Sequence, residues 1–405
     1  MALIVQKYGG SSVATAERIL AVAKRIVAAK EAGSGLVVVV SAMGKTTDEL
    51  IRLAHQVAPE PDERELDMLM STGETVSATL MAMALRSMGH TAISLTAGQA
   101  GIRTDSLHGR ARIKSVDSER LWRELDAGKI VIVTGFQGIT DEYDVTTLGR
   151  GGSDTTAVAL AAALKADRCD IYTDVDGVYT ADPRIVPEAR KLDEISYEEM
   201  LEMAQLGSKV MHPRSVELGE AFRIPIMVRS SFNDEMGTLI HEVGEMETRN
   251  RVRGIAHDLN VGKISVVGVP DRPGLASSIF EPLAEAGISV DVIVQNVSVE
   301  GATDLSFTLG LADLAKALRI VEPVAQQIGA KQVTSSDNLG KVSIVGAGIQ
   351  SAPGIAAAMF RCLYDAGINI EMISTSEIRI TCIVDRERVE EAVQKLHVAF
   401  ELDKE

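Results

Sequence analysis

Short, largely apolar runs alternate with helical stretches up to about residue 243, and this alternation constrains the fold more than any other feature. Residues 3–5, 36–40, 130–133 and 169–172 form four such runs, and a turn follows each of them. Apolar strands that alternate with helices are typical of a mostly parallel sheet covered on both faces. Such sheets bind ligands beyond the carboxyl ends of their strands. We therefore expect an α/β fold whose site lies at these turns.

The composition excludes several classes of protein. The chain has 405 residues, 46% of them hydrophobic, which predicts two or three domains. Its net charge of -16 argues against a nucleic-acid partner. The longest aliphatic run is far shorter than the roughly 18 apolar residues of a membrane helix, so we expect a soluble, cytoplasmic protein with no membrane partner. Three scattered cysteines predict neither a disulfide framework nor a metal site made by the protein alone.

The last third of the chain contains a repeat with a spacing of about 80 residues. Residues 262–268 (GKISVVG) recur as 340–346 (GKVSIVG), and Pro273-Gly274 recurs as Pro353-Gly354. Each copy predicts a small βαββαβ unit, and two copies are too few for a solenoid. We therefore expect two small-molecule-binding modules after a polar, charged linker.

Residues 7–12 (KYGGSS) form a glycine-rich turn between a predicted strand and a predicted helix. Gly9 and Gly10 allow the backbone to approach an anion without a Cβ clash, and the unpaired N–H groups of the helix point toward it. Lys7 is either a cation for a phosphoryl group during transfer or a solvated surface residue. The neighbouring glycines favour the first interpretation, with Lys7 exposed at the mouth of the site.

A second glycine-rich turn, residues 149–154 (GRGGSD), also precedes a predicted helix. Asp154 is a normal residue at a helix start, but three glycines around Arg150 lose more backbone entropy than a plain loop requires. The planar guanidinium suits bidentate binding of a carboxylate. We expect Arg150 to contact a ligand.

Two further segments have both a structural and a functional interpretation. Residues 41–47 contain Gly-Lys-Thr, but Val39 stands where a Walker A loop needs a glycine, which argues against a P-loop. What remains is an anion-binding turn or a capped helix start at Thr46 or Thr47. Glu74 follows Ser71 by three residues, in what we expect to be the first turn of a helix. It either completes a capping box or binds an ammonium group.

Residues 173–184 follow a strand and combine turn-forming residues with Tyr179 and Arg184. They form either a plain loop or a nucleotide-binding segment, with Tyr179 against the base and Arg184 on phosphate. Lys209 is a second candidate cation for phosphate, although by itself it is a weak one. The histidines show no metal-ligand spacing.

These motifs, in this order, resemble those of the aspartokinases, and the tandem repeats resemble the ACT modules of that family. The resemblance covers essentially the whole chain, without a fused dehydrogenase. It implies a three-layer amino-acid-kinase fold at residues 1–245, a linker at 246–261, and ferredoxin-like ACT modules at 262–338 and 339–405. It also implies that MgATP phosphorylates the β-carboxylate of L-aspartate in the first step toward lysine, threonine and methionine.

The resemblance further implies roles for individual residues. Those of the catalytic group are Lys7, Asp154 and Lys209. Those on the ATP side are Lys7, Tyr8, Gly9, Gly10, Ser11, Thr173, Asp174, Tyr179, Arg184 and Lys209. Those on the aspartate side are Ser41, Thr47, Glu74, Arg150, Gly151, Gly152, Ser153 and Asp154, with Arg150 on the α-carboxylate and Glu74 on the ammonium group.

For the repeats, the resemblance implies feedback inhibition by lysine, threonine or both, bound between chains of a homodimer or higher oligomer. The effector residues it implies are Asp271, Pro273, Gly274, Leu275, Ala276, Asp291, Gln295, Asn296, Ser351, Pro353, Gly354, Ile355, Asn369 and Ile370. Met246 is a candidate internal start for a separate regulatory subunit. A dimerisation domain without effector binding is the alternative.

Two other functions remain open on the sequence. A kinase for glutamate or acetylglutamate is not expected to combine Arg150 and Glu74 with paired ACT-like repeats. A non-catalytic amino-acid sensor predicts a loss of the phosphate-side residues, whereas Lys7, Asp154 and Lys209 are all present.

Overall fold

The computed structural model describes residues 2–208, 210–243, 252–270, 272–297, 302–349 and 352–404. These residues form two compact units. The N-terminal unit contains the described residues up to 179 and those from 191 to 243. The C-terminal unit contains residues 180–190 together with the described residues from 252 onward. Each unit has a hydrophobic core of its own.

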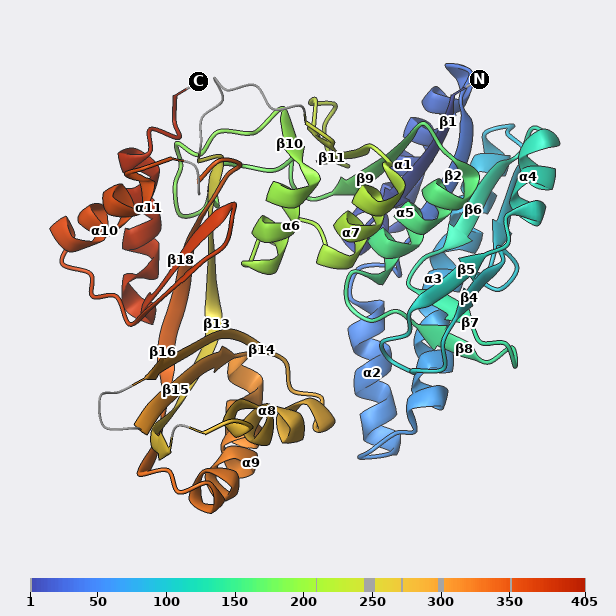
Figure 1. The fold of residues 1–405 in the computed structure, drawn as a ribbon. Helices are drawn as coiled ribbons and strands as arrows, with labels where there is room; N and C mark the ends of the chain where they lie inside the picture. Colours follow the sequence, from blue (N-terminus) through green and yellow to red (C-terminus); the bar gives the residue numbers. More distant parts are fainter. Residues whose placement is uncertain are drawn as a thin grey trace. The chain divides into compact units, whose positions relative to one another are not determined.

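The N-terminal unit is built on an eight-stranded sheet in the order β10-β12-β11-β9-β1-β2-β6-β3 (Figure 1). All neighbouring pairs are parallel except β11 and β12. The strands are β1 (Leu3–Tyr8), β2 (Gly35–Val40), β3 (Ala92–Leu95), β6 (Ile130–Thr134), β9 (Arg168–Thr173), β10 (Glu194–Ser196), β11 (Ile226–Ser230) and β12 (Thr238–His241). The prediction of a mostly parallel α/β sheet is confirmed.

Helices cover both faces of this sheet because its central strands are apolar on both sides. Every residue of β2 and β6 is buried. On one face, α1 and α3 contribute Ile19, Ile26 and Leu85 to a core with Val38 and Ile130, while α5 packs against β1, β2 and β9. The helices are α1 (Ala16–Glu31), α2 (Thr46–Val57), α3 (Glu63–Ser87), α4 (Glu119–Asp126), α5 (Gly152–Leu164), α6 (Tyr197–Gln205) and α7 (Pro213–Phe222).

A smaller, four-stranded sheet in the order β5-β4-β7-β8 lies in the same unit. It is formed by two segments of chain, one after β3 and one after β6. Its last strand, β8, leads directly into the glycine-rich turn before α5. Its strands are β4 (Ile102–Thr104), β5 (Ile113–Val116), β7 (Gln137–Ile139) and β8 (Val145–Thr147).

The C-terminal unit contains one six-stranded antiparallel sheet in the order β14-β15-β13-β16-β18-β17. The repeated segments lie in its central strands and in helices that begin just after Gly274 and Gly354, both at positive φ. The elements are β13 (Gly254–Pro270), α8 (Leu275–Glu285), β14 (Val290–Val297), β15 (Ala302–Leu309), α9 (Leu314–Gln327), β16 (Gln332–Val345), α10 (Ile355–Asp365), β17 (Met372–Thr375), β18 (Arg379–Asp385) and α11 (Val389–Ala399).

Two long strands interleave the repeats. Residues 263–267 of β13 pair with 332–336 of β16 and complete the first βαββαβ unit, whereas residues 254–258 pair with 341–345. The second repeat therefore receives its outer strand from residues that precede the first repeat. Residues 254–261, which the sequence analysis assigned to the linker, thus lie in β13.

The two repeats are also joined by a reciprocal pair of charge contacts. Lys263 donates to Glu371 at 3.1 Å, and its repeat counterpart Lys341 donates to Asp291, the counterpart of Glu371. Each lysine thus contacts the carboxylate of the other repeat. Burial lowers the pKa of Lys341, whereas nearby Asp258 opposes that effect.

The segment 180–190 belongs to the C-terminal unit although it falls within residues 1–245. Ala181 and Val186 are buried in the same core as Leu396. Thr180 accepts a backbone bond from Ile255, and its hydroxyl lies 3.0 Å from Nε2 of His397. A segment from within the N-terminal part of the chain therefore packs in the C-terminal unit. The sequence did not distinguish this segment from its surroundings.

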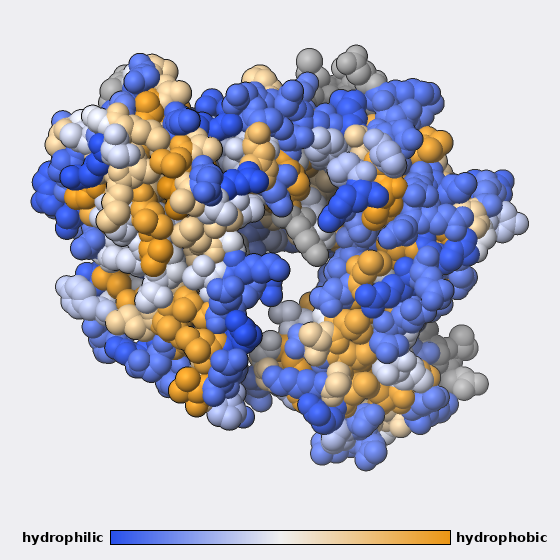
Figure 2. All heavy atoms as spheres, turned by 180° about the vertical axis from the view of Figure 1, so that it is seen from behind, coloured by the Kyte–Doolittle hydropathy of each residue, from blue (hydrophilic) through white to orange (hydrophobic). Residues whose placement is uncertain are grey.

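No helix among the described residues is long and apolar enough to cross a membrane. Figure 2 shows hydrophobic residues in separate patches within a mostly hydrophilic face. Some exposed apolar side chains lie on α2 and α3, including Leu53, Met68 and Met83. Cys169, Cys362 and Cys382 are free.

A charge at position 186 should destabilise the C-terminal unit rather than the N-terminal one. Val186 is 3% exposed, and burying an unpaired carboxylate there should cost at least about 3 kcal/mol. In Val186→Asp, hydrogen exchange followed by mass spectrometry should accelerate in α11 and β13 before α5 and α7. Val57→Asp, at an exposed position on α2, is the control. Equal acceleration in both units would contradict the assignment of residues 180–190.

Candidate active site

The carboxyl ends of β9, β1, β2 and β6 lie side by side and bring the predicted turns to one edge of the sheet. Lys7 lies near the end of β1, Ser41 follows β2, Gly135 follows β6 and Thr173 ends β9. Segments that are more than 100 residues apart in sequence therefore meet, as Ser41 Oγ shows by donating to Ser153 Oγ at 2.9 Å.

Lys7 and Asp154 form the central ion pair of this edge. Lys7 Nζ lies 2.6 Å from Asp154 Oδ1. Lys7 is only 8% exposed and Asp154 9%, so the expectation of an exposed lysine is wrong. Asp154 lies in the first turn of α5, where the helix dipole favours its negative charge. The pair fixes the ammonium group between β1 and α5, at the point where the two glycine-rich turns meet.

The first glycine-rich turn runs close to two neighbouring loops. Gly9 N donates to Tyr172 O at 3.2 Å, and Gly44 N donates to Gly10 O at 3.0 Å. A Cβ on Gly10 would stand 2.9 Å from Ala42 O, so the backbone contact requires glycine at this position.

The side chains of this turn divide between the core and the surface. Tyr8 is fully buried and stacks on Tyr172 with ring centroids 4.6 Å apart, which leaves only its backbone for a ligand. Ser11 is exposed, whereas Ser12 donates to Ser231 Oγ at 2.8 Å. Ser231 was missed because no motif surrounds it.

Glu74 is a buried carboxylate with one oxygen left without a partner. It is 2% exposed, and Oε1 accepts from the Ala42 N–H at 3.1 Å, while Oε2 has no hydrogen-bond partner among the residues that the structure describes. Burial raises the pKa of Glu74 to about 7, although its backbone hydrogen bonds oppose the shift. A ligand that offered a cationic donor to Oε2 would satisfy the group and favour its charged form.

The helix that holds Glu74 begins earlier than the sequence predicted. The helix α3 starts at Glu63, capped by Asp62, so Glu74 lies in its middle and the capping box of Ser71 is wrong. Ser71 Oγ instead donates to Met68 O. Position 73 of the helix requires a glycine, because a Cβ there would lie only 2.8 Å from Ala42 Cβ. Close packing against the loop after β2 is thus what brings Ala42 to Glu74.

The second glycine-rich turn displays Arg150. Gly149 and Gly151 have φ values of 76° and 68°, and a Cβ on Gly151 would fall 2.2 Å from His212 Cβ. Gly151 precedes the first residue of α5, Gly152, which is followed by Ser153. Arg150 is exposed and makes no hydrogen bond or ion pair with the residues that the structure describes. Its guanidinium is therefore available to a ligand.

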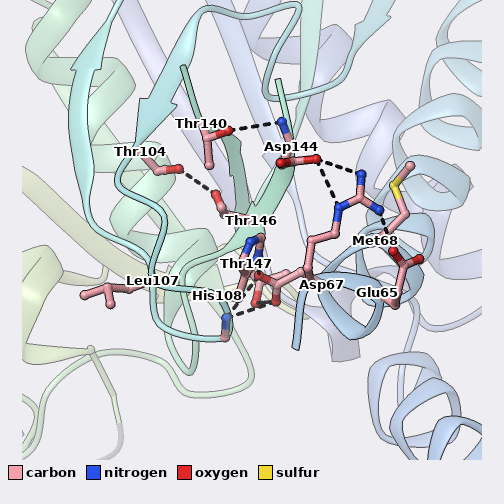
Figure 3. A network of polar contacts seen from close by, with 12 residues as sticks. Glu65, Asp67, Met68, Thr104, Leu107, His108, Thr140, Asp144, Thr146 and Thr147 are labelled. Atoms are coloured by element: carbon pink, nitrogen blue, oxygen red, sulfur yellow. Dashed lines mark hydrogen bonds and ion pairs between the residues drawn. The ribbon is translucent and has the colours of Figure 1, made fainter. Parts of the chain in front are cut away.

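A buried carboxylate on α3 holds the strand from which this turn emerges (Figure 3). Asp67, which is fully buried, accepts from Thr147 Oγ1 at 2.5 Å and from Gly109 N at 3.0 Å, and it contacts His108 Nδ1 at 2.9 Å. Thr147 ends β8, two residues before Gly149. One side chain thus fixes both β8 and the loop beside it.

Further contacts extend this support to the turn itself. Arg214, on α7, donates to Leu148 O at 2.9 Å and to Ala111 O at 3.0 Å. The loop of residues 105–112 also packs on the turn, because a Cβ on Gly149 would lie 3.1 Å from Gly109 O. Asp67 and Arg214 were not predicted as functional residues, because neither is part of a short motif.

Comparisons with known proteins agree with this arrangement. The profile of the amino acid kinase family matches residues 2–230, and that of the ACT domain matches residues 264–323 and 342–400. A curated aspartokinase of Mycolicibacterium smegmatis is 52% identical, over 99% of this chain and 97% of the relative. The chain belongs to the aspartokinase family. It is therefore an enzyme, a phosphotransferase of the amino acid kinase family.

Two solved structures of E. coli aspartokinase III share this fold at 28% sequence identity. The complex with aspartate and ADP, described as the R-state, has a TM-score of 0.85. The complex with lysine and aspartate, described as the T-state, has a TM-score of 0.76. Each match covers 98% of this chain and 99% of the other.

The nucleotide-side residues expected of an aspartokinase are only partly brought together. Thr173 ends β9, its hydroxyl donates to Asp174, and its carbonyl accepts from Ser231 N at 2.9 Å. Tyr179 lies in the same unit, and partial burial raises its pKa. Arg184 belongs to the C-terminal unit, where it pairs with Asp182 at 2.6 Å. Lys209 lies outside the described residues.

On the aspartate side, Thr47 lies in the first turn of α2 and is half-buried. Lys45 is the N-cap of that helix without a side-chain cap, so the capped start at Thr46 or Thr47 is not found. Among the described residues, no group of three or more histidine, cysteine or acidic side chains could hold a metal.

The predicted effector residues of the aspartokinase repeats occupy equivalent places in the two copies. Pro273, Gly274 and Ala276, at the start of α8, correspond to Pro353, Gly354 and Ala356 at the start of α10. Leu275 is buried and Ile355 half-buried. On and before the edge strands, Asp291, Gln295, Asn296 and Asn369 are exposed, and Ile370 is half-buried. Asp271 and Ser351 lie outside the described residues.

Replacing Glu74 by glutamine should stabilise the ligand-free enzyme increasingly as the pH rises. The folded-state pKa of about 7 lies above the ordinary 4.5, so the folded protein binds more protons than the unfolded chain between these values. Because of Glu74, the folded enzyme therefore loses stability as the pH rises through this window. The gain of Glu74→Gln should grow by on the order of 3 kcal/mol between about pH 5 and about pH 8.

Chemical denaturation at each pH measures this difference. Glu124→Gln is the control, because the hydrogen bond from Lys129 lowers the pKa of Glu124 and its carboxylate stays ionised over the same window. A pH-independent difference for Glu74→Gln would contradict the raised pKa.

Removing the charge of Asp67 should loosen the Arg150 turn. Asp67→Asn replaces one acceptor oxygen by a donor, which should destabilise the network by about 2 kcal/mol. We expect the KM for the amino-acid substrate to rise several-fold while the KM for ATP changes little. Thr147→Val should act in the same direction, whereas Thr147→Ser keeps the hydroxyl and should remain near the parent. A purely structural role would predict lower stability with both KM values unchanged.

Proposed function

We propose that this enzyme transfers the γ-phosphoryl group of MgATP to the β-carboxylate of L-aspartate, giving 4-phospho-L-aspartate and ADP. The unpartnered Oε2 of buried Glu74 is the observation on which this substrate depends. It fits the ammonium group of an amino acid, which would neutralise the carboxylate. The complex of aspartate and ADP with E. coli aspartokinase III supports the same pair of substrates.

Arg150 completes the recognition of the amino acid in this proposal. Its exposed guanidinium binds the α-carboxylate through two parallel N–H bonds. Hydroxyls and backbone N–H groups around the same substrate come from Ser41, Thr47, Gly151, Gly152 and Ser153. With both charged groups of the α-carbon held, the side-chain carboxylate is left free to react.

The reaction needs no general base in the protein. A carboxylate with an ordinary pKa of about 3.9 is ionised near neutral pH and attacks the γ-phosphorus as it stands. A β-carboxylate oxygen forms the new P–O bond, and the bond to the β,γ-bridging oxygen breaks, which releases ADP. The barrier comes from bringing two anions together, so catalysis depends on positioning and on positive charge.

Lys7 provides that charge from a fixed position. Its ion pair with Asp154 holds Nζ where β1 meets α5, so little reorganisation is needed as charge develops on the phosphoryl oxygens. Lys209 is a second cation in the proposal. The nucleotide is contacted by the backbone of Tyr8 and by Gly9, Gly10, Ser11, Thr173, Asp174 and Tyr179.

Magnesium enters this proposal with the nucleotide. In this proposal the cation keeps phosphate and water ligands, as Mg²⁺ usually does. When bound, Mg²⁺ neutralises charge on the β- and γ-phosphate oxygens. Asp174 and Asp154 are the carboxylates of the predicted site that could assist it.

The C-terminal unit regulates the enzyme in this proposal. Lysine, threonine or both bind the ACT modules near the starts of α8 and α10, in a homodimer or higher oligomer, and inhibit the first step of the pathway to lysine, threonine and methionine. The lysine complex of E. coli aspartokinase III supports an amino-acid effector.

An assay of ADP release tests the function. L-aspartate should be phosphorylated well above L-glutamate and N-acetyl-L-glutamate, and lysine or threonine should lower the rate. In Arg150→Ala, the KM for aspartate should rise by at least about tenfold, because a bidentate ionic contact is lost, while the KM for ATP changes little. Equal effects on both KM values would contradict the placement of Arg150. Turnover of glutamate as fast as aspartate would overturn the substrate assignment.

A further inference from the structure

A cavity of about 570 Å³ lies between α5, α7 and β5 in the N-terminal unit. Its volume is within the range of sites that bind small organic molecules. The three elements come from separate parts of the chain but lie together in Figure 1. None of the residues that line it is a predicted substrate or effector residue.

The cavity lies on the face of α5 that is turned away from the ion pair. Val158 and Ala161 of α5 are fully buried, whereas Thr155, Ala159 and Ala162 line the cavity. Ala162 is eight residues beyond Asp154, which places it about 12 Å farther along the helix. The cavity therefore extends along α5 away from the proposed phosphoryl-transfer site, from Thr155, the residue after Asp154, to Ala162 and Ala163.

The lining combines positive charge with an apolar wall. Arg112, Lys114 and Arg214 contribute cations against a single carboxylate, Glu217. Arg112 has no ion pair among the described residues. Lys114 has a long and exposed one, with Nζ 3.6 Å from Oδ2 of Asp141. The apolar wall consists of Ile113, Val116, Ala159, Ala162, Ala163, Leu218, Ala221 and Phe222.

The charges favour an anion. Burial lowers the pKa of Arg214 and the neighbouring Arg112 lowers it further, whereas Asp105 and Glu217 oppose the shift. Two guanidinium groups thus lie near each other beside low-dielectric walls, where an added anion reduces their repulsion. Phe222, which is 58% exposed, offers an apolar surface to the rest of such a ligand.

One residue of the lining connects the cavity to the glycine-rich turn that contains Arg150. Arg214 uses two guanidinium nitrogens to hold Leu148 O and Ala111 O. Leu148 directly precedes Gly149 and Arg150. An anion that draws the Arg214 guanidinium into the cavity therefore competes with the contacts that hold the turn.

We propose that this cavity is a second ligand site of the enzyme, for a small organic anion with a carboxylate or phosphate head and an apolar body. Arg112 and Arg214 bind the head, and the alanine face of α5 with Phe222 binds the body. Occupancy of the site shifts the Arg150 turn and so changes the affinity for the amino-acid substrate. This site is additional to the ACT modules.

Binding of a fluorescent probe to the full chain tests the proposal independently of catalysis. Anilinonaphthalene sulfonate joins a sulfonate to apolar rings and serves as the probe. We expect saturable binding that weakens by at least about tenfold in Arg112→Ala, through loss of a charged partner, and in Ala162→Trp, which fills the cavity. Ala163→Leu is a smaller filling change should Ala162→Trp fail to fold.

Matched controls separate this site from other apolar surfaces. Arg123→Ala removes an exposed arginine from α4, and Ala28→Trp adds an indole to the surface of α1. Both should bind the probe as the parent does. Competition by octanoate and by octyl phosphate then distinguishes a carboxylate head from a phosphate head.

The coupling has its own readout. The probe should raise the KM for aspartate in the parent chain and leave it unchanged in Ala162→Trp. Equal probe affinity in the parent, Arg112→Ala and Ala163→Leu would overturn the site. Binding at the cavity with no change in the KM for aspartate would overturn its connection to the turn. The measurements of probe binding do not depend on whether aspartate is the substrate, so the site can be tested even if the proposed function fails.

Discussion

The ion pair between Lys7 and Asp154 is the contact on which the rest of the site depends. It joins the end of β1 to the first turn of α5. Lys7 is the first residue of one glycine-rich turn, and Asp154 is the last residue of the other. A lysine that is 8% exposed has lost most of its contact with water, and burying an unpaired charge is costly. Asp154 provides a partner for that charge, so the site is positioned before any substrate binds. The proposed electrostatic mechanism requires this order of events, because charge must be in place when two anions meet.

Around this pair, the structure places polar groups that differ in how fully they are satisfied. Asp67 has three partners and supports the turn, whereas Glu74 has one oxygen without any. A satisfied buried carboxylate rigidifies its surroundings, and an unsatisfied one favours a ligand. The same distinction applies to arginine: Arg214 is held by two carbonyls, while Arg150 is exposed. Structural support and the proposed recognition of the substrate therefore reside in different residues of the same chemical type.

The sequence predicted much of this because glycine and apolar patterns report local requirements. The strands at β1, β2, β6 and β9, both glycine-rich turns and the repeat were all predicted from residues close together in the chain. The start of α3 was not, because Ser71 and Glu74 have the spacing of a capping box while Asp62 provides the actual cap. Lys7 was expected to be exposed because its partner is nearly 150 residues away. Such errors concern contacts between distant segments, which no local pattern reports.

The sequence by itself determined the α/β class, the edge of the sheet where the predicted turns meet, the paired modules and the family resemblance, because these depend on periodicity and on short motifs. Only the tertiary structure decided that β13 supplies a strand to both repeats, that residues 180–190 join the C-terminal unit, and that Asp67 and Arg214 hold the Arg150 turn. Strand pairing and burial depend on which distant segments meet. The packing of whole helices and strands decides which segments meet, and the sequence of a single segment does not specify its distant partner.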